Sequence, residues 1–502
     1  MDKKQRRSGI LLPISALPSP YGIGTLGKEA YGFVDFLSRS GSKIWQILPL
    51  GVTSYGDSPY QSFSAKGLNY YFLDLDILIE KGLLTKEEVM SCDMGDNPSK
   101  IDYGKLFENR IPLLKKAFSR FDRTNIAFET FVREEEYKDF AFYMTLKSLH
   151  DFRPYYEWKD ESRHYSRELE EKVIKEHEDL YLFYVWTQYE FLFQYYKLKH
   201  YANARGIEIM GDIPLYLSRD SVECYKNPEL FLFDQKGEPT YVAGCPPDYF
   251  APKGQLWGNP IFDWERMKEN HYAFFRNRLD YSLSLYDILR IDHFRGLAAY
   301  YRIPYGREDA VVGEWVAGPG IALFEGRLDD PIVAEDLGFM DDKVRKLLKE
   351  TGFPGMKVLE FAFDGQKDNE HLPSNCTENY FSYTGTHDNM PIYGYLTTLD
   401  ENGLQTYRRT LREECEKFAV PYRGDALKDL ARTTVSLSYC LKTMANIVPI
   451  QDLLLLGNES RMNTPSLLSD QNWSYRTKKE NFSEALVKQI QEDRHLGRRD
   501  GN

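Results

Sequence analysis

Eight short apolar runs recur along the chain, and each ends in proline, glycine or a cluster of polar residues. They cover residues 9–15, 43–50, 207–214, 287–294, 331–338, 356–363, 380–388 and 447–454. Runs of this length and composition are typical of buried β-strands. The last run is the weakest candidate because Pro449 interrupts it, and proline cannot donate a ladder hydrogen bond.

Amphipathic stretches with a helical period separate these runs. Residues 28–40 carry their apolar side chains on one face and are followed by Gly41, while residues 341–351 open with acids and are followed by Gly352. Strands that alternate with helices run parallel, and eight of them can close into a barrel with the helices outside. The pattern therefore predicts an α/β fold, a (β/α)8 TIM barrel.

A bare barrel of this kind needs about 250 residues. Roughly half of this chain of 502 residues must therefore lie in insertions within one catalytic domain, residues 1–502. We predict a mainly helical inserted subdomain at 76–179, a substrate-groove loop region at 220–263 and a smaller insertion at 304–330. The aromatic helix 180–204 is expected to pack into the core, and the tail beyond residue 494 is expected to be disordered.

The composition argues against a nucleic-acid or membrane partner. The chain has 64 Lys plus Arg against 76 Asp plus Glu, a net charge of −12, and no basic stripe that could follow a phosphate backbone. No apolar stretch approaches the roughly 20 residues that a membrane-spanning helix needs. The hydrophobic content of 42% is that of a globular protein.

The cysteines and the first residues favour a cytoplasmic location. Basic residues precede the first apolar run as in a secretory signal, but Pro13 interrupts that run and no small-residue cleavage site follows. The cysteines show no CxxC spacing and suit buried thiols in a reducing compartment. There are six: Cys92, Cys224, Cys245, Cys376, Cys415 and Cys440.

Three of the runs deliver a carboxylate to the rim where a parallel barrel carries its catalytic groups. Asp292 lies near the end of the fourth run, Glu335 near the end of the fifth, and Asp388 beside His387 at the end of the seventh. Attack on an anomeric carbon needs an ionised carboxylate, and the leaving oxygen needs a second, protonated acid. We assign these roles to Asp292 and Glu335. Asp388 and His387 are expected to hold sugar hydroxyls as the ring flattens.

Arg290 affects the ionisation that the role of Asp292 requires. It lies two positions before Asp292, on the same side of a strand, and a neighbouring guanidinium lowers a carboxyl pKa by about 1 to 3 units. Asp292 is therefore expected to stay ionised. A structural interpretation is also open, because strand-end carboxylates cap helices and Arg290 with Asp292 can form a buried ion pair. Three carboxylates on one rim favour catalysis.

Two other motifs suggest a cofactor or a metal and are rejected. Residues 22–27 match GxGxxG, but the proline-containing segment 18–20 separates them from the strand, and the run 43–50 ends without the acid that would bind a ribose. His293 and His387 lie beside acids, as metal ligands can, but no His-x-His pair ends the first strand. No cofactor and no metal are predicted.

The loops that follow the strands have the composition of a sugar-binding surface. Residues 56–62, 246–250 and 254–260 alternate aromatic side chains with amides, hydroxyls and acids. Sugars pack their C–H groups on aromatic faces and direct their hydroxyls to hydrogen-bonding groups. Each segment alone could equally be an ordinary turn or part of an aromatic core.

Together these segments resemble the 4-α-glucanotransferases of the amylomaltase, or disproportionating enzyme, family, which are related to the α-amylase barrels. The resemblance runs from Ser8 to Asn463, nearly the whole chain. The motifs that carry it are Gly211-Asp212-Ile213-Pro214, Asn227-Pro228-Glu229-Leu230-Phe231, Gly254 to Pro260, Arg290 to Gly296 and Thr384 to Asn389.

This resemblance implies residue roles that agree with the strand-end interpretation. Asp292 would be the nucleophile, Glu335 the general acid and then base, and Asp388 the transition-state stabiliser. It further implies substrate-binding residues around the donor sugar and along the glucan groove. They are Tyr60, Asp212, Arg290, His387 and Asn463 at the donor sugar, and Tyr249, Phe250, Gln255 and Trp257 along the groove. The implied partners are malto-oligosaccharides and α-1,4-glucans derived from starch or glycogen.

The chain departs from the family pattern at three places. Met390 stands where the family tends to have Asp, residues 251–253 replace a more usual Ser-x-Thr, and Pro465-Ser466 with Gln471 and Tyr475 departs from a Gly- and Trp-bearing pattern. These departures bear on acceptor preference and on the last loop, not on the catalytic trio.

The predicted reaction is transfer of a glucan segment to the 4-hydroxyl of an acceptor by two inversions. Such a retaining mechanism requires the carboxyl groups of Asp292 and Glu335 to lie about 5 to 5.5 Å apart. Two alternatives remain open, an α-glucan hydrolase built on the same barrel and a non-catalytic glucan-binding protein.

Overall fold

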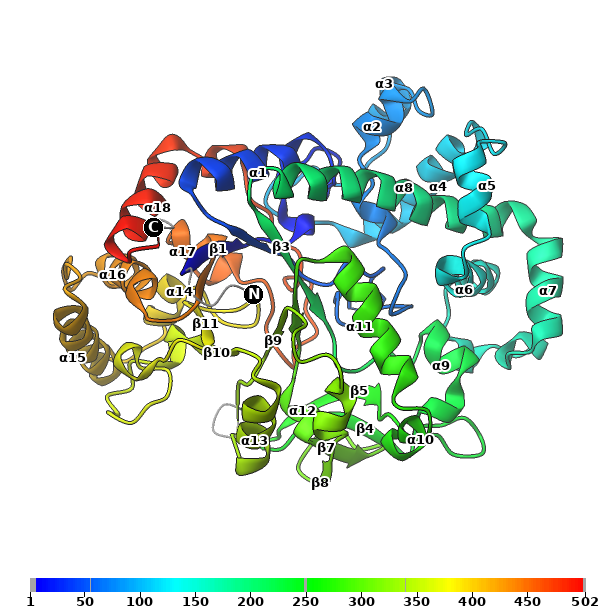
Figure 1. Ribbon diagram of the computed structural model, residues 1–502. Helices are drawn as coiled ribbons and strands as arrows, with labels where there is room; N and C mark the ends of the chain where they lie inside the picture. The colour runs from blue at the N-terminus through cyan, green and yellow to red at the C-terminus, as the bar shows by residue number, and fades with distance from the viewer. Residues whose placement is uncertain (1–5, 55, 248–250, 339, 500–502) are drawn as a thin grey trace.

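The computed structural model describes residues 6–54, 56–247, 251–338 and 340–499. Eight parallel strands form a barrel in the centre of the molecule (Figure 1), with the order β10-β11-β12-β1-β2-β3-β6-β9. The barrel closes between β9 and β10, where the Ala334 N–H donates to the Pro354 carbonyl at 2.8 Å. The strands are β1 Arg7–Leu11, β2 Ile44–Gln46, β3 Glu208–Ile213, β6 Ile288–Ile291, β9 Ile332–Ala334, β10 Gly355–Val358, β11 Tyr380–Tyr383 and β12 Ala445–Pro449. The predicted TIM barrel is confirmed.

Each of the eight apolar runs overlaps one barrel strand, and most runs extend beyond it into the loop at the carboxyl end. The weakest run, 447–454, shows why. Its strand, Ala445–Pro449, ends at the proline, and the rest forms helix α17, Ile450–Leu453. Pro449 stands at the last strand position and directly before the helix, so its missing N–H breaks no interior ladder.

The two helices predicted in detail are present with their expected ends. Helix α1 spans Lys28–Ser40, and α13 spans Asp342–Thr351 with the Asp341 side chain accepting from the Val344 N–H at 3.0 Å. Gly41 and Gly352 follow them in the left-handed conformation, with φ of 75° and 66°. That conformation is one that glycine adopts without strain, so it ends each helix cleanly.

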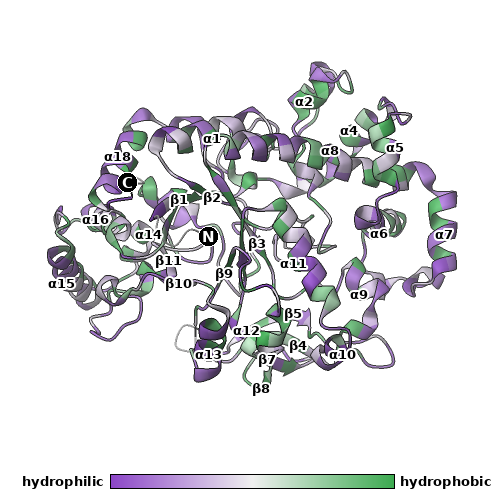
Figure 2. Cartoon of the chain, in the orientation of Figure 1, coloured by the Kyte–Doolittle hydropathy of each residue, from purple (hydrophilic) through white to green (hydrophobic). Residues whose placement is uncertain are grey.

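The remaining helices surround the barrel and fill the insertions. Figure 2 shows apolar residues gathered on the barrel strands and mostly polar residues on α15 at the periphery. The helices are α2 Leu75–Glu80, α3 Lys86–Met90, α4 Tyr103–Ser119, α5 Ile126–Val132, α6 Lys138–Leu149, α7 Arg167–Glu176, α8 Glu178–Asn203, α9 Val222–Lys226, α10 Trp264–Glu269, α11 Ala273–Leu285, α12 Arg295–Ala298, α14 Ile392–Leu396, α15 Glu401–Phe418, α16 Leu427–Cys440 and α18 Glu484–Leu496. Within the described ranges, no helix has both the length and the apolar character needed to cross a membrane.

Helices α2 to α7 fall in or beside the segment 76–179, and α8 connects them to the barrel. The aromatic side chains of α8 pack inward as predicted, with Tyr184, Phe191 and Tyr195 fully buried. Lys81 of the segment pairs with Glu190 of α8 at 2.7 Å. The division of the chain into a catalytic domain and inserted subdomains stays a prediction.

A second, four-stranded antiparallel sheet was not predicted. Its order is β5-β4-β7-β8, formed by Tyr241–Cys245 (β4), Gln255–Pro260 (β5), Ala299–Pro304 (β7) and Glu314–Ala317 (β8). It lies at the lower edge of the molecule in Figure 1. These strands are short, and β4 and β5 lie in a segment rich in proline, glycine and aromatic residues, where the sequence indicated loops. Strand β4 pairs with β7, and β7 pairs with β8 in the insertion at 304–330. Local propensity does not encode these pairings, which make the segments strands.

The expectation that the tail beyond residue 494 is disordered is wrong for the described residues. Helix α18 continues to Leu496, and the Arg499 side chain is 1% exposed. Its guanidinium donates to the carbonyls of Tyr439, Arg7 and Leu441 at 2.7 to 2.8 Å. These long-range hydrogen bonds fix the tail, and its polar composition gives no sign of them.

The seam between β9 and β10 depends on one buried carboxyl group. Asp336 is 4% exposed and its Oδ1 accepts from the Met356 N–H at 2.6 Å. Burial raises the pKa of Asp336 to about 6. The side chain thus satisfies a strand N–H at the point where the barrel closes.

We expect Asp336→Ala to lower the free energy of unfolding by about 1–3 kcal/mol, because it leaves the buried Met356 N–H without an acceptor. Urea unfolding followed by tryptophan fluorescence measures this change. Asp329→Ala, on an exposed turn, is the matched control and should change stability by less than about 0.5 kcal/mol. Equal stability of the two variants would contradict the assignment.

Candidate active site

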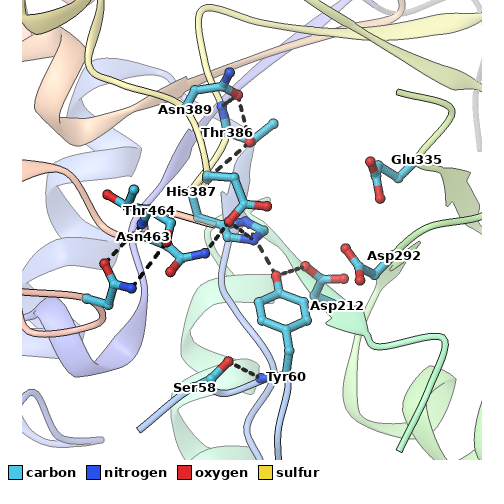
Figure 3. A network of polar contacts seen from close by, with 12 residues as sticks. Ser58, Tyr60, Asp212, Asp292, Glu335, Thr386, His387, Asn389, Asn463 and Thr464 are labelled. Carbon is cyan, nitrogen blue, oxygen red and sulfur yellow. Dashed lines mark hydrogen bonds and ion pairs between the residues drawn. The ribbon is translucent and has the colours of Figure 1, made fainter. Parts of the chain in front are cut away.

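The three predicted carboxylates lie at the carboxyl ends of three barrel strands. Asp292 follows β6, Glu335 follows β9 and Asp388 follows β11. In Figure 3 the carboxyl groups of Asp292 and Glu335 face the same space, with Tyr60 and His387 on the other side of it. The side chains of Asp292, Glu335 and Asp388 keep 27%, 16% and 43% of their surface exposed, so a ligand can reach all three.

Arg290, on β6, joins three carboxylates beneath this space. Its Nη1 lies 2.6 Å from Asp212 Oδ2 and 3.1 Å from Asp292 Oδ1, and its Nη2 lies 3.4 Å from Glu335 Oε2. The guanidinium is buried, with 3% of the side chain exposed. A planar fork with fixed donors can hold carboxylates from three strands in one arrangement. The predicted pairing of Arg290 with Asp292 is confirmed.

The predicted direction of the Asp292 pKa shift is wrong. Burial raises the pKa of Asp292 to about 6, and the repulsion of Asp212 and Asp388 adds to it, against the opposing effect of Arg290. Burial also raises the pKa of Glu335, to about 8, with the Asp292 charge contributing. Desolvation disfavours the charged form of both groups. At neutral pH the pair still separates into a mainly ionised Asp292 and a mainly protonated Glu335, as acid and nucleophile require.

His293 contributes in a way that sequence reasoning missed. Its φ of +48° is uncommon for a side chain other than glycine, and its backbone N–H donates to Glu335 Oε2 at 2.5 Å. The residue after Asp292 therefore holds the carboxyl group of Glu335. Burial lowers the pKa of the His293 imidazole to about 3, so the ring stays neutral.

The donor-sugar residues implied by the resemblance are brought together. Tyr60, from the loop after β2, donates from its hydroxyl to Asp212 Oδ2 at 2.7 Å, and its ring stacks on His387 with centroids 4.9 Å apart. Figure 3 shows Tyr60, Asp212 and His387 around one side of the space that Asp292 borders. A flat aromatic face beside carboxylate and imidazole groups suits a pyranose ring.

Asp388 is held by the last loop of the chain. Asn463 Nδ2 donates to Asp388 Oδ1 at 2.6 Å, and His387 Nε2 lies 3.4 Å from the same oxygen. Arg461 Nη2 donates to the Asp388 carbonyl at 2.6 Å. Arg461 was not predicted as a site residue, because its role depends on a contact across 73 positions of sequence.

The groove residues are only partly described. Gln255 and Trp257 lie on β5, where Trp257 Nε1 donates to Gln255 Oε1 at 3.1 Å. The Trp257 ring meets His293 edge to face, with centroids 4.7 Å apart, so the insertion reaches the turn that carries Asp292. Tyr249 and Phe250 lie outside the described residues.

Comparison with known proteins agrees with this geometry. The model of a family described as 4-alpha-glucanotransferase matches residues 12–481. The chain belongs to the 4-alpha-glucanotransferase family. The 4-alpha-glucanotransferase of Streptococcus pneumoniae is 44% identical over 494 residues, which are 96% of this chain and 95% of the relative. That of Thermus thermophilus is 40% identical, covering 94% of each chain.

Solved structures of amylomaltases share the fold of this chain. An amylomaltase from Streptococcus agalactiae in complex with acarbose has a TM-score of 0.92 at 38% identity, covering 99% of this chain and 100% of that one. An amylomaltase from Corynebacterium glutamicum, at 18% identity, shares the fold with a TM-score of 0.78, covering 99% of this chain and 75% of that one. The family resemblance predicted from the sequence is confirmed.

The glycine motif at 22–27 has a packing role in this family member. A Cβ on Gly24 would lie 1.7 Å from the Ile14 carbonyl oxygen, and one on Gly27 would lie 1.9 Å from Asp74 Oδ2. The close approach of the loop to its neighbours explains both glycines without a dinucleotide. In the part of the chain that the structure describes, no group of three or more His, Cys, Asp and Glu residues could hold a metal ion.

Proposed function

We propose that this enzyme moves α-1,4-glucan segments from a donor malto-oligosaccharide to the 4-hydroxyl of an acceptor glucan or glucose, by a retaining double displacement. The observation that carries the proposal is the Arg290 cluster. One buried guanidinium holds Asp212, Asp292 and Glu335 at the strand ends, and the pKa values of Asp292 and Glu335 are raised to about 6 and about 8. Such a pair provides an anion and a proton in one cavity.

In the first step the Asp292 carboxylate attacks the anomeric carbon of the donor. The glycosidic bond breaks, its electrons stay on the leaving 4-oxygen, and Glu335 gives that oxygen its proton. A covalent glycosyl-enzyme and a shorter glucan result. In the second step Glu335 takes the proton of the acceptor 4-hydroxyl, whose oxygen displaces Asp292. Two inversions retain the α configuration. The common contact of both carboxyl groups with Arg290 is compatible with the separation of about 5 to 5.5 Å that this chemistry needs.

The other strand-end residues would stabilise the positive, flattened sugar ring of the transition state. Asp388 offers a carboxylate that remains 43% exposed, with Asn463 and His387 orienting it. Tyr60 and Asp212 would bind donor hydroxyls. Groups fixed before substrate arrives stabilise developing charge without reorganisation at the moment of reaction.

Transfer has to compete with hydrolysis in water. A bound, oriented acceptor reaches effective molarities on the order of 10⁵ M, which exceeds the concentration of water. Gln255 and Trp257 would line the acceptor path. The acarbose complex of the similar Streptococcus agalactiae amylomaltase supports a groove shaped for α-glucans. We further propose a cytoplasmic location, consistent with six cysteines that lie far apart in the sequence and show no CxxC spacing.

Maltotriose as the only substrate tests the function. We expect a ladder of longer glucans together with free glucose. Only glucose and maltose would instead indicate the hydrolase, and binding without any turnover would indicate a glucan-binding protein. Chromatography of the products distinguishes the three outcomes.

The Trp257 ring is expected to contribute binding energy rather than chemistry. Trp257→Ala should raise the KM for maltotriose roughly 3- to 10-fold, since an aromatic contact is worth about 0.5–1.5 kcal/mol. Trp257→Phe, which keeps an aromatic face, should change KM less. Initial rates over a range of maltotriose concentrations give both constants. A fall in kcat at constant KM would contradict a binding role.

A further inference from the structure

Glu360 is a buried acid that the proposed chemistry does not use. It lies in the short 3-10 helix Leu359–Phe361, directly after β10, the barrel strand between those that lead to Glu335 and Asp388. The residue is 8% exposed, and its Oε2 has no hydrogen-bond partner. Its backbone N–H donates to the Thr384 carbonyl at 3.0 Å, at the start of the loop that carries Asp388.

The Glu360 carboxyl group is connected to that loop through Asn389. The side chain of Asn389 and the backbone N–H of Met390 both lie next to the Glu360 carboxyl group. The other end of the Asn389 amide, Oδ1, accepts from the N–H and the hydroxyl of Thr386, each at 2.8 Å. Figure 3 shows this pair of contacts. Asn389 therefore closes the turn from residue 386 to 389 around Asp388, and Glu360 holds Asn389 from outside the turn.

Two charged groups near Glu360 also contact the segment 384–392, which carries Asp388. Arg461 faces Glu360 and donates to the carbonyls of Asp388 and Asn463 at 2.6 and 2.8 Å. Asp452 faces it from α17 and accepts from the Ile392 N–H at 2.7 Å. Burial, with the repulsion of Asp452, raises the pKa of Glu360 to about 8, against the attraction of Arg461. Near neutral pH the group is mainly a neutral acid, for which glutamine is a close substitute.

We propose that Glu360 is a positioning residue that fixes the orientation of Asp388 through Asn389. The inference rests on the transition-state role proposed for Asp388. Glu360 donates no proton to the substrate and does not contact the reacting atoms. Glu360 supports the turn from the side of β10, while Asn463 and Arg461 support it from the side of the last loop. A carboxylate held from both sides keeps the geometry that transition-state stabilisation demands.

Kinetics of E360A and E360Q test the proposal, with E378A, which removes an exposed glutamate, as the control. At pH 6.5 we expect E360A to lower kcat for maltotriose at least tenfold while KM changes less than threefold. E360Q, which keeps the acceptor for Asn389, should recover kcat to within about fivefold of the wild type. E360A with wild-type kcat would overturn the proposal, as would an E360Q variant as impaired as E360A.

Combined variants show whether Glu360 acts through the turn. Residues in one hydrogen-bond network give non-additive effects, so E360A should lower the kcat of N389A less than threefold, and likewise that of D388N. Independent, multiplicative losses would overturn the positioning role. If D388N itself keeps wild-type kcat, the proposed role of Asp388 fails instead. Where E360A yields no folded protein, N389S carries the test and must lower kcat at least tenfold at nearly constant KM.

Discussion

Asp292→Asn should lower kcat/KM for maltotriose by at least about 10⁴-fold, because removal of the covalent nucleophile from an otherwise intact site lowers the rate by this factor or more. The amide matches the carboxyl group in shape and can still contact Arg290, but it cannot form the glycosyl-enzyme. The rate of glucose release by the purified variant measures the effect. Because the site keeps its shape, calorimetric binding of maltotriose should persist.

Asp329→Asn is the control for this substitution, since Asp329 lies on an exposed turn and should keep wild-type kcat/KM. A variant at position 292 with activity within tenfold of the wild type would exclude Asp292 as the nucleophile. Any turnover by the wild type, abolished in the variant, excludes a non-catalytic glucan-binding protein.

The barrel was predictable because burial on both faces gives parallel strands a continuous apolar pattern. Each of the eight runs overlaps a strand, and the caps of α1 and α13 follow from Gly41, Asp341 and Gly352. The antiparallel sheet was not predictable in the same way. Its strands pair segments that are far apart in the sequence, such as Val242 with Ile303, and no local signal specifies that partner.

The meeting of the three candidate catalytic carboxylates was predictable for a topological reason. Parallel strands direct their carboxyl ends to one rim, so Asp292, Glu335 and Asp388 had to meet there. The electrostatics were not predictable from spacing. The sequence shows Arg290 two positions before Asp292. Only the structure shows that the effect of burial, which raises the Asp292 pKa, outweighs the effect of Arg290, which lowers it.

The missed residues share one property, which is that they act through the backbone or through a distant contact. His293 serves Glu335 with its main-chain N–H, and Arg461 binds a carbonyl in the Asp388 loop. A backbone donor is available from any residue except proline. Residue type therefore carries no signal for such a role.

Glu335→Gln should lower kcat/KM for maltotriose by about 10²–10⁴-fold, the usual contribution of a positioned general acid. The loss should depend on the leaving group. An activated donor such as an α-maltosyl fluoride needs no proton at the departing atom, so this variant should still form the glycosyl-enzyme from it. Mass spectrometry of the trapped intermediate measures this step. Asp292→Asn should form none from either donor, which separates the two roles.

The pH profile gives an independent test of the same assignment. Activity needs an ionised Asp292, so kcat/KM should rise as the pH increases through about 6. Activity also needs a protonated Glu335, so kcat/KM should fall as the pH increases through about 8. In Glu335→Gln the fall above pH 8 should disappear, while the rise near pH 6 should stay in place, because Glu335 is already protonated and uncharged at that pH. Initial rates from pH 4 to 10 in both proteins measure this. A basic limb that survives in Glu335→Gln would mean that another group supplies the proton.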